Sequence, residues 1–232
     1  MSENTSEHIL TPQGQQCLQA LMRTWFEFER QLGRVPLIQR LERGQFSQAD
    51  YRQLLLNWRQ QVIEGSRWIS RCASSFDRDY SDVRSVIIGH AREEHRDYEM
   101  LEQDFVAAGG ELTAIQQASR NVGTEALHGF LMYRASQTNP ADLIGAMWII
   151  EGLGQKMASS WAEQIDKSTK SDGSFTRFMR YHGANDDDHM QKLYQLIDRL
   201  CQSPDQLSTI VRTARVTARL YCLQLEEVDN EY

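Results

Sequence analysis

The chain has 232 residues, a formal net charge of −7 and a hydrophobic content of 41%, which is enough to bury one sizeable core. The acidic balance excludes the basic surface that nucleic acid or an anionic membrane requires, so a small molecule is the expected kind of ligand. No stretch reaches 18 uncharged apolar residues, and the first residues lack the pattern of a secretory signal. We therefore expect a cytoplasmic protein without a membrane span.

Apolar residues recur at intervals of three and four almost throughout, which predicts an all-α fold in a single domain. We expect a disordered leader at 1–11, one helical domain over 12–228 and a frayed tail at 229–232. The expected helices are 12–32, 36–44, 48–75, 82–109, 112–137, 141–167, 174–201 and 204–228.

Capping signals mark several of these boundaries. Ser47 and Asp50 have the spacing of a capping box. The pair Gly109 and Gly110 is expected to end the helix over 82–109. Ser203, which precedes a proline, is the expected N-cap of the last helix. Four cysteines lie far apart without a CxxC pair, so we expect reduced, packed thiols and no nucleophile (Cys17, Cys72, Cys201 and Cys222).

Polar residues interrupt the apolar face of the helix expected at 82–109. His90, Glu94 and Asp97 follow at i, i+4 and i+7, which would place them on one side of a helix. A charged run of this kind usually covers a solvent-exposed face, so metal ligands and an exposed face are equally supported here. Glu93 is the alternative to Glu94, and His95 is expected on the exposed side.

Glu151 is the most diagnostic residue of the helix expected at 141–167. It is the only charge between Leu143 and Gln155. A buried carboxylate without a partner costs several kcal/mol or more, so a cation or a strong donor must meet it. A metal ion and a buried arginine are the two alternatives. Gly152 and Gly154 indicate the close approach of a backbone or a ligand.

The segment YHGANDDDHM places His182, Asp186 and His189 at i, i+4 and i+7 in the helix expected at 174–201. Two imidazoles and a carboxylate on one face suit iron, manganese or zinc, and the lack of a nearby thiolate argues against structural zinc. In the alternative interpretation, 183–185 end one helix and Asp186 caps the next. The neighbours Asp187 and Asp188 are expected at the surface.

These residues carry a resemblance to a known family. The segments AREEHRDYEMLEQDFVAAGG, GAMWIIEGLGQKMA and FMRYHGANDDDHMQKL, together with the earlier RLERGQFSQADYRQLLLNW, resemble the haem-oxygenase-like diiron oxidases, also called iron-containing redox enzymes. That superfamily includes thiaminase-II-like and quinone-cofactor biosynthesis proteins. The resemblance spans most of residues 20–200 and implies a haem-oxygenase-like helical bundle.

Carried over position by position, the family pattern implies six metal ligands from three helices: Glu94, Asp97, Glu151, His182, Asp186 and His189. Asp97 departs from the pattern, because that position is commonly histidine, and one metal position is weakened or changed in charge as a result. Two residues are weaker candidates. His90, one turn before Glu94, could compensate for the missing histidine at position 97, and Glu64 lies on the helix expected at 48–75.

The resemblance implies reductive activation of O2 by two Fe2+ ions, with manganese as an alternative metal and without haem. The expected partners are an amino-acid-like or fatty-acid-like substrate, O2 and an electron donor, while a homodimer remains open. Met147, Trp148, Phe178 and Met179 would line either a substrate cavity or an ordinary core.

Three other functions remain open. In a haem-binding oxygenase, the segment IGAMWIIEGLG would lie over the haem, but His8 in the leader is the only early histidine. A cofactorless thiaminase-II-like enzyme would need a cysteine beside a base. The third alternative is a non-catalytic helical protein whose metal site has decayed.

Overall fold

The computed structural model describes residues 10–230, apart from the side chains of residues 186–188. Residues 1–9 of the expected leader and 231–232 of the expected tail therefore lie outside the described residues. Residues 10–230 contain helices and no strand, as the sequence predicts. The α-helices are α1 (Pro12–Leu32), α2 (Pro36–Glu42), α3 (Gln48–Val62), α4 (Gly65–Ser75), α5 (Ser81–Glu94), α6 (Tyr98–Ala107), α7 (Leu112–Gln117), α8 (Val122–Ala135), α9 (Leu143–Leu153), α10 (Ser159–Thr169), α11 (Arg177–Leu200) and α12 (Pro204–Glu226).

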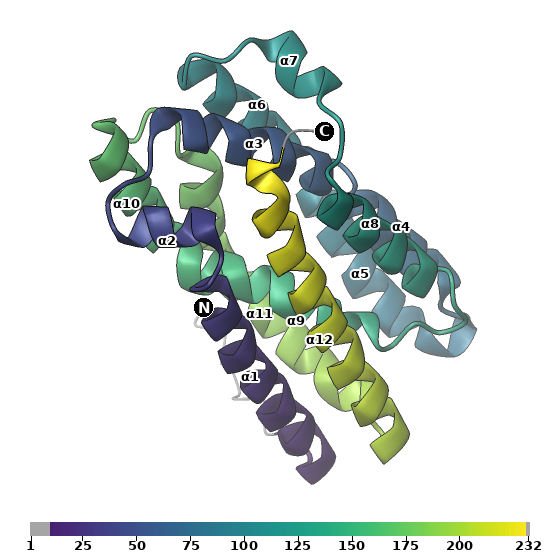
Figure 1. Cartoon of the computed structure of the whole chain (residues 1–232). Helices are drawn as coiled ribbons and strands as arrows, with labels where there is room; N and C mark the ends of the chain where they lie inside the picture. Colours follow the sequence, from purple (N-terminus) through teal and green to yellow (C-terminus); the bar gives the residue numbers. More distant parts are fainter. Residues whose placement is uncertain (1–9, 231–232) are drawn as a thin grey trace, which may run out of the picture.

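The long helices pack lengthwise into one bundle (Figure 1). α12 lies beside α1 and also packs against α8 and α9, while α11 packs against α9 and α10. Gly145 allows the close crossing of α9 and α12, because a Cβ atom there would clash with the carbonyl oxygen of Ile210. None of the described helices combines the length and apolar composition that a bilayer crossing needs.

Three of the expected long helices are wrong, because each is divided in two. The helix expected at 48–75 breaks between Val62 and Gly65, and that expected at 112–137 breaks before Asn121, whose side chain caps α8. The helix expected at 82–109 ends at Glu94, where the ring of His95 hydrogen-bonds the carbonyl of Arg92. These side-chain bonds compete with the helical backbone pattern and so favour a boundary.

The expected caps at Ser47 and Ser203 and the expected helix over 174–201 are confirmed. Ser47 and Asp50 form a reciprocal capping box, and Ser203 caps α12. The backbone of α11 is continuously helical from Arg177 to Leu200, so the alternative in which 183–185 end a helix is wrong. The segment expected at 141–167 is also continuous, but it contains a π-helical turn, η2 (Gly154–Ala158).

Candidate metal centre

The first group of candidate ligands surrounds Glu151. One ligand atom each from His90, Glu94, Glu151 and His189 lies within 4.8 Å of the others. Glu151 Oε1 is 3.1 Å from His90 Nε2, and its Oε2 is 3.0 Å from His189 Nδ1. The two imidazole rings meet edge to face, with centroids 4.9 Å apart. Glu151 therefore pairs with two imidazoles, and the alternative of a buried glutamate–arginine pair is wrong.

A second group lies directly beside the first. It consists of Glu94, Asp97 and His182, with one ligand atom of each again within 4.8 Å of the others. His182 Nε2 is 3.3 Å from Asp97 Oδ2. Glu94 belongs to both groups, and its Oε1 is also 3.6 Å from His189 Nδ1. Its carboxylate thus stands between the two sets of donors.

Three helices and one turn position these side chains. α5 supplies His90 and Glu94 one turn apart, and α9 supplies Glu151. The sequence predicts Asp97 on the same helix as His90. That prediction is wrong, because Asp97 is the N-cap residue of α6. The turn between α5 and α6 nevertheless returns its carboxylate to the centre. His182 on α11 contributes from the opposite side of the centre.

The side chain of Asp186 lies outside the described residues, although its backbone is part of α11. Its place at i+4 from His182 and i−3 from His189 keeps it on their face of the helix. Its role as a metal ligand therefore stays a prediction from the sequence. The side chains of Asp187 and Asp188 are likewise not described.

Burial makes the charges of the centre interdependent. Burial raises the pKa of Glu94 to about 8, and the neighbouring charge of Glu151 adds to the rise. Burial also acts to raise the pKa of Glu151, but His90 and His189 hold it well below its ordinary value. Burial acts to lower the pKa of His90, yet the charge of Glu151 raises it overall. The protein keeps one carboxylate ionised by surrounding it with imidazoles.

Several buried ligand atoms lack a hydrogen bond of good geometry. Among the residues that the structure describes, these atoms include Glu94 Oε1 and Asp97 Oδ2, which have imidazole nitrogens at 3.6 Å and 3.3 Å. Burying polar atoms without hydrogen bonds is costly, and native proteins satisfy the great majority of them. A cation bound between the two groups would supply the missing interaction. The donors are carboxylate oxygens and imidazole nitrogens, which fit iron or manganese.

Of the two weaker candidate ligands, one lies in the centre and the other does not. His90 lies inside the first group, whereas Glu64 lies in neither. Glu64 is buried against Arg120, 2.7 Å away, and Arg67, 3.0 Å away, so the structure gives it a salt-bridge partner instead. Glu93 approaches His189 from outside, at 3.3 Å, and binds Lys192.

Of the two adjacent glutamates, it is thus Glu94 that faces the centre. His95 is exposed, as the sequence predicts.

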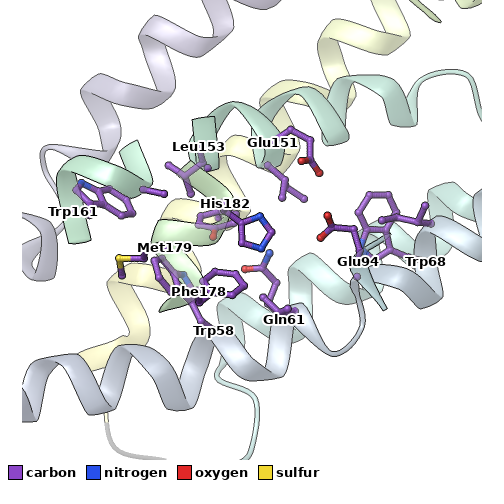
Figure 2. A pocket seen from close by; sticks show the side chains of 17 residues that line it. Trp58, Gln61, Trp68, Glu94, Glu151, Leu153, Trp161, Phe178, Met179 and His182 are labelled. Atoms are coloured by element: carbon purple, nitrogen blue, oxygen red, sulfur yellow. The ribbon is translucent and has the colours of Figure 1, made fainter. Parts of the chain in front are cut away.

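A narrow internal cavity of about 80 Å3 reaches this centre. Figure 2 shows His182 in the middle of the lining, with Glu151, Glu94 and Trp68 to one side of it and Trp161 to the other. Of the four residues for which the sequence left a cavity or an ordinary core open, Phe178 and Met179 line the cavity. Such a volume holds a few water molecules or a short, slender group. Apart from the candidate ligands, the lining is mainly aromatic and aliphatic: Trp58, Val62, Trp68, Ile69, Ile150, Leu153, Trp161, Phe178, Met179 and Tyr221.

The sequence did not single out most of this lining. Trp58, Trp161 and Tyr221 come from α3, α10 and α12, and each reads locally as an ordinary buried position. Met147 and Trp148, which were candidates for the lining, are buried elsewhere in the core. The glycine pair after Glu151 did carry a signal. A Cβ atom at Gly152 would press on the Trp25 ring, and Gly154 lines the cavity, so one packs against a ring and the other keeps space.

The family described as iron-containing redox enzymes matches residues 68–222, well over half of the chain and all of the described ligand groups. The chain belongs to the iron-containing redox enzyme family. This membership agrees with the nitrogen and oxygen donors of the centre. No curated protein matches the chain.

Solved structures show that this member of the iron-containing redox enzyme family has a haem-oxygenase-like fold. A domain of unknown function with that fold from Shewanella denitrificans is 16% identical, with a TM-score of 0.83 over 92% of this chain and 90% of that one. A TenA homologue from Pseudomonas syringae is 14% identical, with a TM-score of 0.73 over 94% and 93% of the two chains. A TenA homologue from P. horikoshii is 13% identical, with a TM-score of 0.72 over 91% and 97%.

Proposed function

We propose that the chain is a non-haem diiron oxidase or oxygenase that uses O2 to oxidise a small substrate held beside the metal ions. The observation that supports this most strongly is the position of Glu94, which belongs to both groups of candidate ligands. A carboxylate has two oxygen atoms and can bind one metal ion with each. A single shared glutamate between two adjacent sets of donors is therefore suited to a dinuclear centre.

The charge of the proposed centre also suits two divalent ions. The described carboxylates of Glu94, Asp97 and Glu151 contribute three negative charges when ionised, and Asp186 is the fourth ligand predicted from the sequence. Four carboxylates balance two Fe2+ ions, so the buried centre becomes neutral when it is filled. Manganese satisfies the same charge and donor requirements and remains the alternative metal.

When bound, two ferrous ions supply the electrons for reductive activation of O2. The residues of the chain then hold and orient the reactants. The aromatic walls keep bulk water away from the part of the cavity where Glu94 and His182 lie. Among the described residues, no lysine or arginine lines this cavity, so we propose that it receives an apolar part of a fatty-acid-like or amino-acid-like substrate.

The thiaminase-II-like alternative gains no support from the cysteines. Cys17, Cys72, Cys201 and Cys222 are all buried, and none lines the cavity. Burial raises the pKa of Cys72, which disfavours the reactive thiolate. The haem alternative depends on His8, which lies outside the described residues.

Anaerobic titration with ferrous iron tests the proposal. We expect close to two equivalents to bind, followed by a transient visible absorption band on mixing with O2. Glu94→Gln should reduce the stoichiometry to one equivalent or less, because it removes the carboxylate shared by both groups. The matched control is Glu163→Gln, an exposed position on α10, which should still bind two equivalents.

Binding of one ion or none by the unaltered chain would contradict the proposal. So would two equivalents that persist unchanged in Glu94→Gln. Addition of haem provides a separate check, because a strong Soret band would favour the haem-binding alternative instead.

A further inference from the structure

A groove lies between α4 and α5 on the outer surface of the bundle. It has a volume of about 450 Å3 and is separate from the internal cavity. Figure 1 shows the two helices packed side by side along one edge of the molecule. α4 contributes three serines and α5 contributes basic and apolar side chains, so the groove has a different character on each wall: Ser66, Ser70, Ser74, Arg84, Ile88, Arg92 and His95.

The groove is basic on a chain whose net charge is −7. Among the described residues, no aspartate or glutamate lines it, and neither Arg84 nor Arg92 forms an ion pair. Ile88 lies between the two arginines along α5 and is 54% exposed. An exposed apolar residue flanked by unpaired positive charges has the composition of a small protein-binding surface, with an apolar middle and a charged rim.

The same two helices carry the candidate metal centre and its cavity on their inner faces. On α5, His90 and Glu94 point inward while Arg92 lines the groove. On α4, Trp68 lines the internal cavity while Ser70 lines the groove. The groove and the proposed metal centre are therefore separated by about the thickness of one helix, on the order of 10 Å.

The proposed oxidase needs a source of electrons, and the internal cavity is not suited to hold a redox cofactor. The internal cavity, at about 80 Å3, is too small for a flavin or a nicotinamide, and it has no lysine or arginine for a cofactor phosphate. The candidate ligands are themselves buried, with His90 only 6% exposed. A cofactor of that size does not fit beside the candidate ligands, so we expect the reducing equivalents to come from a donor outside this cavity.

We propose that the groove between α4 and α5 is the docking surface for a small acidic electron-carrier protein. The inference rests on the proposed function. Each docked carrier would give up one electron from its reduced cluster and become oxidised, and one ferric ion of the proposed centre would become ferrous. Because the chain is negative overall and the groove is lined by arginines, an acidic carrier would be attracted to the groove more than to the acidic parts of the surface, which would also orient the encounter.

The spacing of the arginines favours a protein over a small anion. Arg84 and Arg92 are eight residues apart on α5, which is about 12 Å along a helix. A row of carboxylates on a protein surface matches this spacing without drawing the two side chains together, whereas a single phosphate group would need both of them to converge on it. Ile88 between them offers an apolar contact that a phosphate does not use. Small, charged and transient interfaces of this kind are typical of electron-transfer partners.

Binding to the metal-free protein tests the docking surface independently of iron. The probe is an acidic plant-type [2Fe–2S] ferredoxin, titrated into the full chain by isothermal calorimetry at low ionic strength. We expect micromolar affinity that weakens steeply as salt is added. The double variant Arg84→Glu with Arg92→Glu should bind at least tenfold more weakly, while Arg84→Lys with Arg92→Lys should remain within about threefold of the unaltered chain.

Arg23→Glu with Arg30→Glu, at two exposed positions on α1, changes the net charge by the same amount and is the matched control, which should bind normally. Circular dichroism verifies that each variant is folded. Absence of a complex at low salt, or an equal loss in the control, would overturn the docking proposal. Failure of the proposed function would appear separately, as a wrong iron stoichiometry in a chain that still binds the ferredoxin.

Discussion

Asp104 is a buried carboxylate outside the metal centre that joins two of the helices that build it. It accepts hydrogen bonds from the backbone N–H groups of Arg177, at 3.1 Å, and Phe178, at 3.0 Å, at the start of α11. The N-cap residue of α11 makes no such bond with its own side chain, so the cap is supplied by α6. Asp104 follows Asp97 by two turns, and Phe178 precedes His182 by one, which fixes the register of that ligand pair.

We predict that Asp104→Asn lowers the free energy of unfolding by about 1–2 kcal/mol at pH 7, because an amide offers only one acceptor atom to two N–H groups. Urea denaturation measures the change. The matched control is Asp205→Asn, an exposed position in the first turn of α12, which should change stability by less than about 0.5 kcal/mol. Equal effects of the two substitutions would contradict the capping role.

The pH dependence gives a second test at this residue. Burial raises the pKa of Asp104 to about 6, although its two backbone hydrogen bonds oppose the rise. The folded state therefore retains a proton between the ordinary pKa and pH 6 that the unfolded state releases, so this contribution to stability grows as the pH falls. From pH 7 to pH 5, the unaltered chain should gain about 1 kcal/mol relative to Asp104→Asn. If the unaltered chain instead lost stability relative to Asp104→Asn between pH 7 and pH 5, the raised pKa of Asp104 would be contradicted.

Among the elements, α11 packs against η2 and the start of α10 beside the centre. Gly183 follows His182 directly, and a Cβ atom there would collide with Ser159 Oγ and lie 3.1 Å from the Ser159 backbone nitrogen. Ser159 begins α10 at the end of the π-helical turn that follows Glu151. The π-helical turn and the glycine thus let α9 and α11 bring their ligands together. Such turns within α-helices are frequent at functional sites.

We predict that Gly183→Ala destabilises the protein by about 1–3 kcal/mol through this overlap and weakens iron binding by displacing His182. Thermal unfolding and the ferrous titration measure the two effects. Gly129→Ala is the control, because Gly129 is exposed on α8 with open space around its Cβ position. That substitution should stabilise the chain by about 0.5–1 kcal/mol and leave iron binding unchanged. Normal stability and affinity in Gly183→Ala would disprove the packing argument.

For the whole molecule, the candidate centre is a concentration of buried charge that joins α5, α6, α9 and α11. The metal-free protein must hold several buried carboxylates with few compensating donors, which opposes folding. A metal that binds only the folded state adds stability in proportion to its occupancy. Stability and iron binding should therefore be linked across the entire domain.

We predict that ferrous iron at about 100 times its Kd stabilises the folded state by about 3 kcal/mol, which raises the Tm by roughly 5–10 °C for a chain of this size. Anaerobic differential scanning calorimetry measures the shift, and a chelator should reverse it. Glu94→Gln should lose most of the rise, whereas Glu163→Gln should retain it. A Tm independent of iron would contradict a metal centre within the cooperative core.

The sequence was sufficient for the all-α fold and for most of the candidate ligands, because helical periodicity shows which polar residues interrupt a buried face. Glu151 is the clearest case, since its apolar surroundings already demanded a buried partner. Boundaries within long helical stretches were less predictable. The break after Glu94 depends on how the His95 ring meets the Arg92 carbonyl, and no periodic pattern records that bond.

What the sequence determined by itself was local: the helices, their caps, and the spacing that places His182 and His189 on one face. Only the tertiary structure decided which carboxylates meet them. It placed Glu94 in both ligand groups, brought in His90, returned Asp97 through a turn and gave Glu64 to Arg120. The physical reason is that side-chain direction along one helix follows from backbone geometry, whereas the approach of separate helices depends on packing throughout the bundle.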